Sequence, residues 1–146
     1  MLLRDLPEVY GVDRWSYGAD RSALIFAALR LHPGGGLVAR DTSGRVKGFL
    51  VRNPSPSATR MGPFLASTPD VARLLLSRAL RESLRDGGPV KPCEAIFTGA
   101  ALAHDLFEEF GFEGRADRLR MELGEAPALP ASTGLAHYST TPYLAT

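Results

Sequence analysis

Residues 59–124 read TRMGPFLAS, TPDVARLLLSRALRESLRDGG, PVKPCEAIFTG, AALAHDLFEEFGFEG and RADRLRMELG. The second block predicts an amphipathic helix, because its apolar residues recur on one face at helical spacing: Val71, Ala72, Leu75, Leu76, Ala79 and Leu80. Thr68 as N-cap and Pro69 mark its start, and Gly87 with Gly88 marks its end. The last block alternates apolar and charged residues, as a strand does. The stretch therefore predicts strand, helix, strand, helix, strand, which favours a layered α/β domain.

Met61, Gly62 and Pro63 interrupt the first of these strands. Proline cannot donate to a ladder and glycine weakens a strand interior, so a bulge or an opening between strands is expected here. A helix start follows at once, and such a start offers unpaired N–H groups and a favourable dipole to an anion. Two plainer readings stay open, an edge bulge and a helix cap made by Thr68.

The first half of the chain predicts two helices and a hairpin. Residues 5–14 form a short helix with Asp5 as its cap, and the apolar spacing of residues 24–31 predicts a second helix capped by Asp20 or Ser22. The runs LVARD and VKGFLVRN flank a glycine-containing turn at residues 42–45, as the two strands of a β-hairpin do.

The composition is that of an ordinary soluble protein. The 146 residues are 45% apolar and 23% charged, which fits one domain with a real core. A net charge of +1 gives no electrostatic reason to expect that the chain binds nucleic acid. The first residues lack the apolar core of a signal peptide, and no run reaches the length of a membrane span. We therefore expect a cytoplasmic protein that binds neither nucleic acid nor membrane.

The composition changes after Gly124. The segment EAPALPASTGLAHYSTTPYLAT lacks helical periodicity and contains three prolines. We expect residues 1–124 to form the domain and residues 125–146 a C-terminal tail, either extended over the surface or partly disordered. The aromatic end of the tail predicts local docking, and His137 or Tyr138 could reach back over a cleft.

Few side chains suggest chemistry on their own. Tyr17, Asp20 and Arg21 form the best polar cluster, which could line a substrate cleft or could be a helix cap with a neighbouring ion pair. Cys93 has no evident His or Asp partner and is expected to be a small, buried apolar residue. Three dispersed histidines and one cysteine have no metal-ligand spacing, so no metal is expected.

The order of predicted elements resembles the GNAT acyltransferase superfamily. Residues 106–112, LFEEFGF, with Ala103 before them, look like the family segment A-x-x-L-[YF]-x-x-x-G-F. The segments YGADRSAL (17–24), MGPFLA (61–66) and RMELG (120–124) are similar to the C-terminal half of double-domain GNAT proteins. The resemblance implies a mixed, mostly antiparallel central sheet with helices on both faces, and a first family strand that is short or missing.

The resemblance also implies a site and a reaction. In the family, acyl-CoA lies in the opening between the fourth and fifth strands, and an acetyl group passes to an amine of a small molecule or peptide. Carried over, Phe64, Leu65 and Ala66 would line the pantetheine arm of acetyl-CoA. Residues that would face the pyrophosphate are Thr68, Asp70, Val71 and Ala72. Glu94 as a base near the acyl-transfer centre and Tyr138 are the candidate catalytic groups, although a solvent-facing strand residue is the simpler reading of Glu94.

The sequence departs from the family pattern at three places. Residues 67–72 lack the glycines of the family's pyrophosphate loop, Ala100 replaces an asparagine, and Phe107 replaces the tyrosine that often acts as the acid. These departures favour an alternative, a non-catalytic GNAT-fold module that pairs with a second GNAT domain or with a copy of itself. The short segment before Asp5 also leaves open the alternative that the chain is a piece of a longer protein.

Overall fold

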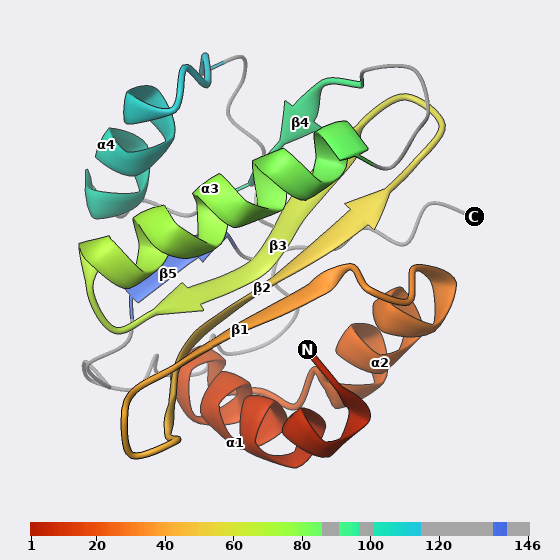
Figure 1. The fold of residues 1–146 in the computed structure, drawn as a ribbon, viewed down its shortest axis with the longest axis vertical. Coiled ribbons are helices and arrows are strands. Elements are labelled where there is room, and N and C mark those ends of the chain that lie inside the picture. Colours follow the sequence, from red (N-terminus) through yellow and green to blue (C-terminus); the bar gives the residue numbers. More distant parts are fainter. Residues whose placement is uncertain (86–90, 97–100, 115–135, 140–146) are drawn as a thin grey trace, which may run out of the picture.

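The computed structural model describes residues 1–85, 91–96, 101–114 and 136–139 (Figure 1). The elements in chain order are η1 (Leu3–Asp5), α1 (Leu6–Tyr17), α2 (Ser22–Leu31), β1 (Gly36–Arg40), β2 (Val46–Pro54), β3 (Thr59–Ala66), α3 (Pro69–Arg85), β4 (Cys93–Glu94), α4 (Ala101–Glu109) and β5 (Ala136–Ser139). None of the helices in the described ranges has the length and apolar character needed to cross a membrane.

The strands form one mixed sheet. Strands β1, β2 and β3 are consecutive antiparallel neighbours, β4 runs parallel to β3, and β5 pairs with β3 in the antiparallel sense. The expected α/β fold with a mostly antiparallel sheet is confirmed. Residues 1–35 contain only helices and turns, so the sheet begins at β1.

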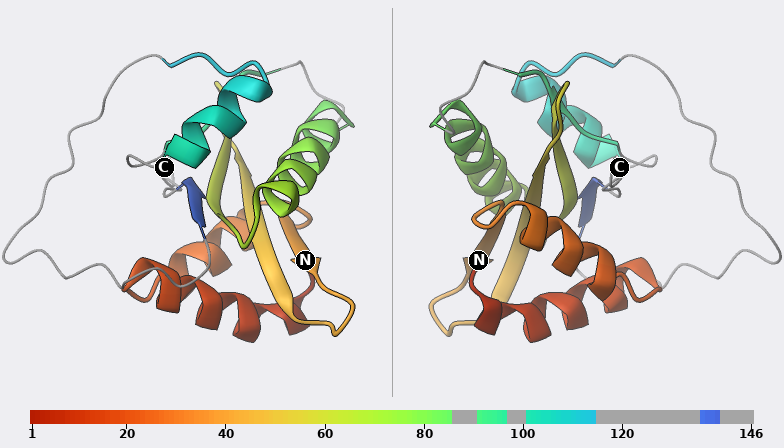
Figure 2. Two further views of the ribbon diagram at one scale, coloured as in Figure 1. Left: turned by 90° about the vertical axis from the view of Figure 1, so that its left-hand side faces the viewer. Right: turned by 90° about the vertical axis from the view of Figure 1, so that its right-hand side faces the viewer.

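Helices cover both faces of the sheet, because successive strand residues point to opposite sides. Phe49, Val51 and Leu65 are fully buried against α1 and α2, in a cluster with Val9, Ile25 and Ala28. On the other face a second cluster joins strand residues to α3 and α4: Leu50, Met61, Phe64, Ala66, Ala72, Leu75, Leu76, Ala79, Ala103, Leu106 and Phe107. Figure 2 shows α3 and the pair of α1 and α2 on opposite sides of the strands.

Helix α3 has the apolar face that its spacing predicts. Leu76 and Ala79 are fully buried, whereas Leu74 and Leu84 on the outer side are exposed. The close approach of α3 to β2 depends on Gly48, because a Cβ there would lie 2.7 Å from the Leu65 carbonyl oxygen and 3.0 Å from Leu75 Cδ1. A side chain at position 48 would therefore clash with the backbone of β3 and with Val71 and Leu75 of α3.

Three expectations need correction or fall outside the structure. Helix α1 runs to Tyr17 rather than ending near residue 14. Asp5 does not cap it, since the Asp5 carboxylate instead accepts the Leu2 N–H at 2.6 Å. The closing strand at residues 118–124, and with it the boundary between domain and tail, lies outside the described residues. Residues 136–139 of the tail join the sheet as β5.

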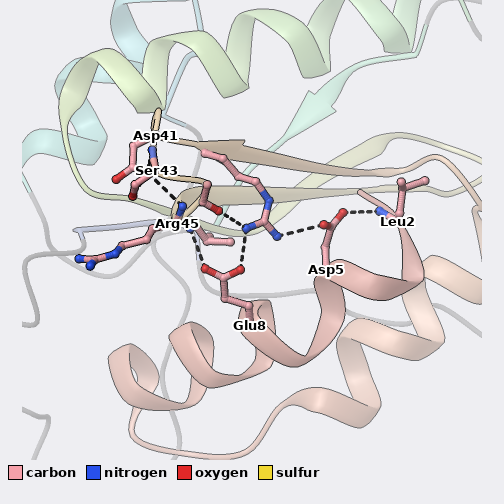
Figure 3. Close-up of polar contacts among 9 residues, drawn as sticks. Leu2, Asp5, Glu8, Asp41, Ser43 and Arg45 are labelled. Atoms are coloured by element: carbon pink, nitrogen blue, oxygen red, sulfur yellow. Dashed lines mark hydrogen bonds and ion pairs between the residues drawn. The ribbon is translucent and has the colours of Figure 1, made fainter.

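A polar network ties the N-terminal helices to the β1–β2 hairpin (Figure 3). The Arg40 guanidinium donates to Glu8 Oε2 at 2.6 Å and to Asp5 Oδ1 at 3.0 Å. Glu8 also accepts the Val46 N–H at 2.8 Å, which is the main cause that lowers the pKa of Glu8. The network therefore holds the first turn of α1 against the end of β1 and the start of β2.

Asp41 organises the hairpin turn (Figure 3). Its Oδ1 accepts the Ser43 hydroxyl at 2.6 Å, the Ser43 N–H at 2.9 Å and the Arg45 N–H at 3.0 Å. These hydrogen bonds to the charged form, the Ser43 hydroxyl above all, lower the pKa of Asp41 to about 2. The turn is therefore bound together by an ionised carboxylate.

We predict that the turn loses its stabilising carboxylate in acid. The pKa of Asp41 is lower in the folded than in the unfolded chain, so its contribution is present above the unfolded pKa of 3.8 and is lost as the pH falls toward about 2. In urea denaturation, Asp41→Asn should be less stable than the wild type near neutral pH, and the difference should shrink between about pH 5 and pH 2. The exposed carboxylate Asp105, replaced in Asp105→Asn, serves as control. A difference for Asp41→Asn that stays constant over this range would contradict the prediction.

Candidate functional site

One edge of β3 is shared by two strands. At its start, β3 pairs with β4 through Thr59↔Cys93 and Arg60↔Glu94. At its end, β3 pairs with β5 through Phe64↔Ser139, Leu65↔His137 and Ala66↔Ala136. Strand β4 therefore parts from β3 after two residue pairs, and β5 takes over the same edge.

The two partners meet β3 on either side of a bulge at Gly62 and Pro63. On the β2 side, Arg52 pairs with Met61 and Leu50 with Phe64, so two β3 residues stand opposite one β2 residue. The peptide bond between Gly62 and Pro63 is cis. The predicted interruption of this strand is confirmed, and it lies just beyond Arg60, where the β3–β4 ladder stops.

Helix α3 begins shortly after β3 ends, and its start is capped from within. Thr68 Oγ1 accepts the Val71 N–H at 3.2 Å, and the Ala72 N–H donates to the Thr68 carbonyl at 3.0 Å. Pro69 has no N–H to offer. The residues predicted to face a pyrophosphate thus lie together at the helix start, but two of their N–H groups already have acceptors.

The start of α3 also carries a cation that sequence analysis did not single out. Arg73 donates through Nη1 to Asp70 at 3.1 Å, and through Nε to both carboxylate oxygens of Glu109 on α4, at 3.0 and 2.9 Å. Glu109 is the main cause that raises the pKa of Arg73. The contact to Glu109 is made across two helices, which explains why residue spacing along the chain gave no sign of it.

The residues predicted to line a pantetheine arm do not share one face. All three are fully buried. Phe64 and Ala66 pack toward α3 and α4, whereas Leu65 packs toward α1 and α2. What the three residues have in common is their backbone edge, which is the edge that β5 occupies.

Phe107 stands where the family resemblance implies an acid, and it is a core residue. Its ring meets Phe64 edge-on with centroids 6.4 Å apart, and Phe112 edge-on at 5.0 Å. Its exposed fraction is 3%. Such aromatic packing stabilises the contact between α4 and the sheet but offers no proton.

The two candidate catalytic residues lie on different partners of β3. Glu94 is on β4, where β3 and β4 still pair, and its side chain is half-exposed with Oε2 3.8 Å from Arg60 Nε. Tyr138 is on β5, at the register irregularity between His137 and Ser139. The structure places both strands on the same edge of β3, with the bulge between them.

The polar cluster of Tyr17, Asp20 and Arg21 forms the junction between α1 and α2. Arg21 is buried, donates to both carboxylate oxygens of Asp13 (2.9 Å from Nε to Oδ2) and stacks over the Tyr17 ring at 3.7 Å. Asp20 accepts the Ser22 N–H at 2.9 Å at the start of α2. The expected cap needs correction, because the N-cap residue of α2 is Arg21, without a side-chain capping bond, rather than Asp20 or Ser22. The expected ion pair is present and joins Arg21 to Asp13. The partner Asp13, eight residues earlier, was missed because buried aspartates are rare unless paired.

The remaining reactive groups show no catalytic arrangement among the described residues. Cys93 is half-buried against the core of α3 and α4, and burial raises the pKa of its thiol, which disfavours the nucleophilic thiolate. His104, Asp105 and Glu108 lie close together on α4, but all three are exposed, and exposed acidic groups are common without a metal.

Comparison with known proteins identifies a family model described as acetyltransferase (GNAT) domain, which matches residues 9–91, more than half of the chain. The match spans the elements from α1 to the end of α3, including the bulged strand and the helix start. No curated protein sequence matches the chain.

Solved structures with TM-scores of 0.61 share the fold at low identity, and a further one is similar over part of the chain. The chain is 25% identical to the GNAT family N-acetyltransferase YhbS from Escherichia coli in complex with CoA, with a TM-score of 0.49 over 60% of this chain and 55% of that one. A probable acetyltransferase is 17% identical with a TM-score of 0.61, over 87% of this chain and 96% of that one. A mutant of TTHA1254 from Thermus thermophilus is 14% identical, with the same TM-score and coverage.

We predict that the Asp13–Arg21 pair is a main support of the α1–α2 junction. Asp13→Asn leaves a buried guanidinium without its counter-ion, which should lower the free energy of unfolding by about 3–5 kcal/mol in urea denaturation. The exposed Asp105→Asn on α4, away from this junction, is the control and should change it by less than about 0.5 kcal/mol. Adding Arg21→Gln to Asp13→Asn should cost less than the sum of the two single changes, because the pair is coupled. A loss below about 1 kcal/mol for Asp13→Asn would refute this role.

Proposed function

This chain belongs to the GNAT acetyltransferase family, and we propose that it transfers an acetyl group from acetyl-CoA to an amine of a small molecule or a peptide. The observation that supports the proposal is the end of the β3–β4 ladder at Arg60, just before the Gly62–Pro63 bulge, with a helix start shortly beyond the end of β3. The family resemblance implies that the acyl-CoA lies beside such an interruption.

The cofactor contacts follow from this opening. The backbone edge of Phe64, Leu65 and Ala66 would pair with the amides of the pantetheine arm. The start of α3, from Thr68 to Ala72, would face the pyrophosphate, where the helix dipole favours negative charge. Arg73 lies at the same helix start, where Asp70 and Glu109 already neutralise its charge, so it could contribute to an anion site only by exchanging one of these carboxylates for the pyrophosphate.

Direct transfer needs two proton movements. The amine nitrogen attacks the carbonyl carbon of the thioester, a C–N bond forms and the C–S bond breaks. The nitrogen gives up a proton and the leaving thiolate takes one. We propose Glu94 as the base that accepts the amine proton, since it lies on β4 just before the two strands part. Tyr138 is the candidate acid, because Phe107 has no proton to give.

A second function is favoured by the packing of Phe107 and by the self-capped start of α3. Both make the chain resemble a GNAT-fold module without catalysis, which would bind a second GNAT domain or a copy of itself. The two functions differ in one measurable property, the affinity of the chain for acetyl-CoA.

We predict that the protein binds acetyl-CoA in calorimetry and that Asp70→Asn binds it more tightly. Asp70 is an exposed anion at the helix start and also holds Arg73. Its removal takes away a like charge near the proposed pyrophosphate site, and two unit charges about 4 Å apart in water interact by about 1 kcal/mol, so the dissociation constant should fall by up to about fivefold. Asp105→Asn is the matched control. If neither the wild type nor Asp70→Asn releases or absorbs heat with up to millimolar acetyl-CoA, although both are folded, the acetyltransferase function is rejected. The non-catalytic module then remains.

We predict that Glu94→Gln slows the transfer without weakening cofactor binding. Loss of a general base typically lowers kcat by about 10²–10⁴-fold. The dissociation constant for acetyl-CoA should stay unchanged, because Glu94 lies opposite Arg60 and not at the edge of residues 64–66 proposed to hold the pantetheine arm. The rate is measured by release of free CoA thiol with a panel of amines, and Glu113→Gln, an exposed carboxylate after α4, is the control. An unchanged kcat for Glu94→Gln would remove Glu94 from the mechanism.

A further inference from the structure

We propose that strand β5 is a built-in competitor of the acyl-CoA, because the two need the same backbone edge of β3. The inference rests on the proposed function, since it assumes that the pantetheine arm pairs with residues 64–66. It adds a regulatory element to that site: a segment of the tail must leave β3 before the cofactor can enter.

At this level β3 has a neighbouring strand on both sides. Leu65 pairs with Phe49 of β2 on one side and with His137 of β5 on the other. Ala66 likewise pairs with Gly48 and with Ala136. A strand with a neighbour on both sides has no free N–H or C=O groups to offer a third extended chain.

A pantetheine arm can pair with a sheet edge in the same way as a peptide strand. It is an extended chain with two amide groups, so it joins a sheet edge through N–H and C=O groups as an added strand does. Beyond the bulge, β4 has already left β3, so the edge at residues 64–66 is the one that both occupants would take. Simultaneous occupation is excluded by geometry.

The ladder between β3 and β5 is suited to exchange. Strand β5 has four residues, and its pairing with β3 is interrupted by an irregularity between Phe64 and Leu65. Strand β2, on the other side, has nine residues. A short and irregular ladder contributes little stability, so a ligand with modest affinity can displace it while the rest of the sheet stays paired.

Two consequences follow for the protein. The apparent affinity for acetyl-CoA equals the intrinsic affinity reduced by the fraction of molecules in which β5 is off the edge. Tyr138 can also serve as the acid only from a position away from β3, because β5 must have left when the cofactor is bound. The tail therefore sets how much of the protein is competent at a given cofactor concentration.

A reversible cross-link tests the competition in the full chain. Ala66 and Ala136 are register partners, and Cα atoms of antiparallel partners lie about 4.5–5.5 Å apart, within the range of a disulfide. The variant Ala66→Cys/Ala136→Cys is made in a Cys93→Ala background to remove the native thiol. Oxidation should lock β5 and weaken acetyl-CoA binding by at least about tenfold, and reduction should restore it. The single-cysteine variants in the same background are the controls.

The opposite change frees the edge. In an antiparallel ladder one of two neighbouring residues points its N–H to the partner strand, so Ala136→Pro/His137→Pro removes a donor whichever one it is. The dissociation constant for acetyl-CoA should fall by about three- to tenfold, which corresponds to β5 being paired in about 70–90% of the molecules. Ala131→Pro/Ser132→Pro, in the tail but outside β5, is the matched control and should bind like the wild type.

The outcomes separate the inference from the function on which it rests. A double-cysteine variant that forms no disulfide shows that β5 is not on this edge and overturns the inference without any ligand. A disulfide that forms but leaves acetyl-CoA binding unchanged overturns the competition and keeps the function. Absence of binding in wild type, proline variant and reduced cysteine variant overturns both. Weaker binding when oxidised, with tighter binding in the proline variant, supports both.

Discussion

Strand β3 is the constraint on which the rest of the structure depends, because Pro63 removes an N–H from the middle of a central strand. The ladder to β4 stops short of that point, and a different strand resumes pairing beyond it. The side chains on either face of β3 nevertheless belong to the two apolar clusters that hold the helices. The apolar packing along β3 is therefore continuous, whereas its hydrogen bonding to β4 and β5 is interrupted at Pro63. Because the packing does not depend on this edge, the edge can change its partner strand without loss of the fold.

Local signals predicted much of this architecture. The spacing from Val71 to Leu80, with Thr68 and Pro69 before it, gave α3 with its start, and the glycine-containing turn gave the hairpin. The bulge followed from the chemistry of glycine and proline alone. Each of these features is decided within a few residues of sequence, so periodicity and turn chemistry suffice to find it.

The contacts that shape the candidate site are of another kind. Arg73 meets Glu109 from a different helix, Arg21 reaches Asp13 across a helix junction, and His137 lies opposite Leu65 far along the chain. No residue pattern specifies which of several carboxylates an arginine will find, or which strand edge a tail will join. Tertiary packing decides which residues become partners. The family resemblance could therefore suggest the candidate site, whereas the pairing of β5 with the edge of β3 became visible only in the structure.

The pairing of β5 with β3 also bears on the order in which the chain folds. Helices α1 and α2, the hairpin and β3 are neighbours along the sequence, so their contacts close short loops at small entropic cost. The β3–β5 ladder joins segments with most of the second half of the chain between them, and it must wait until β3 is already in place. A segment that arrives last and binds through few hydrogen bonds is also the first to detach in the native state. We therefore expect the edge of β3 to be covered only after the N-terminal helices and the first three strands have assembled, so that a newly made molecule passes through a state in which that edge is open.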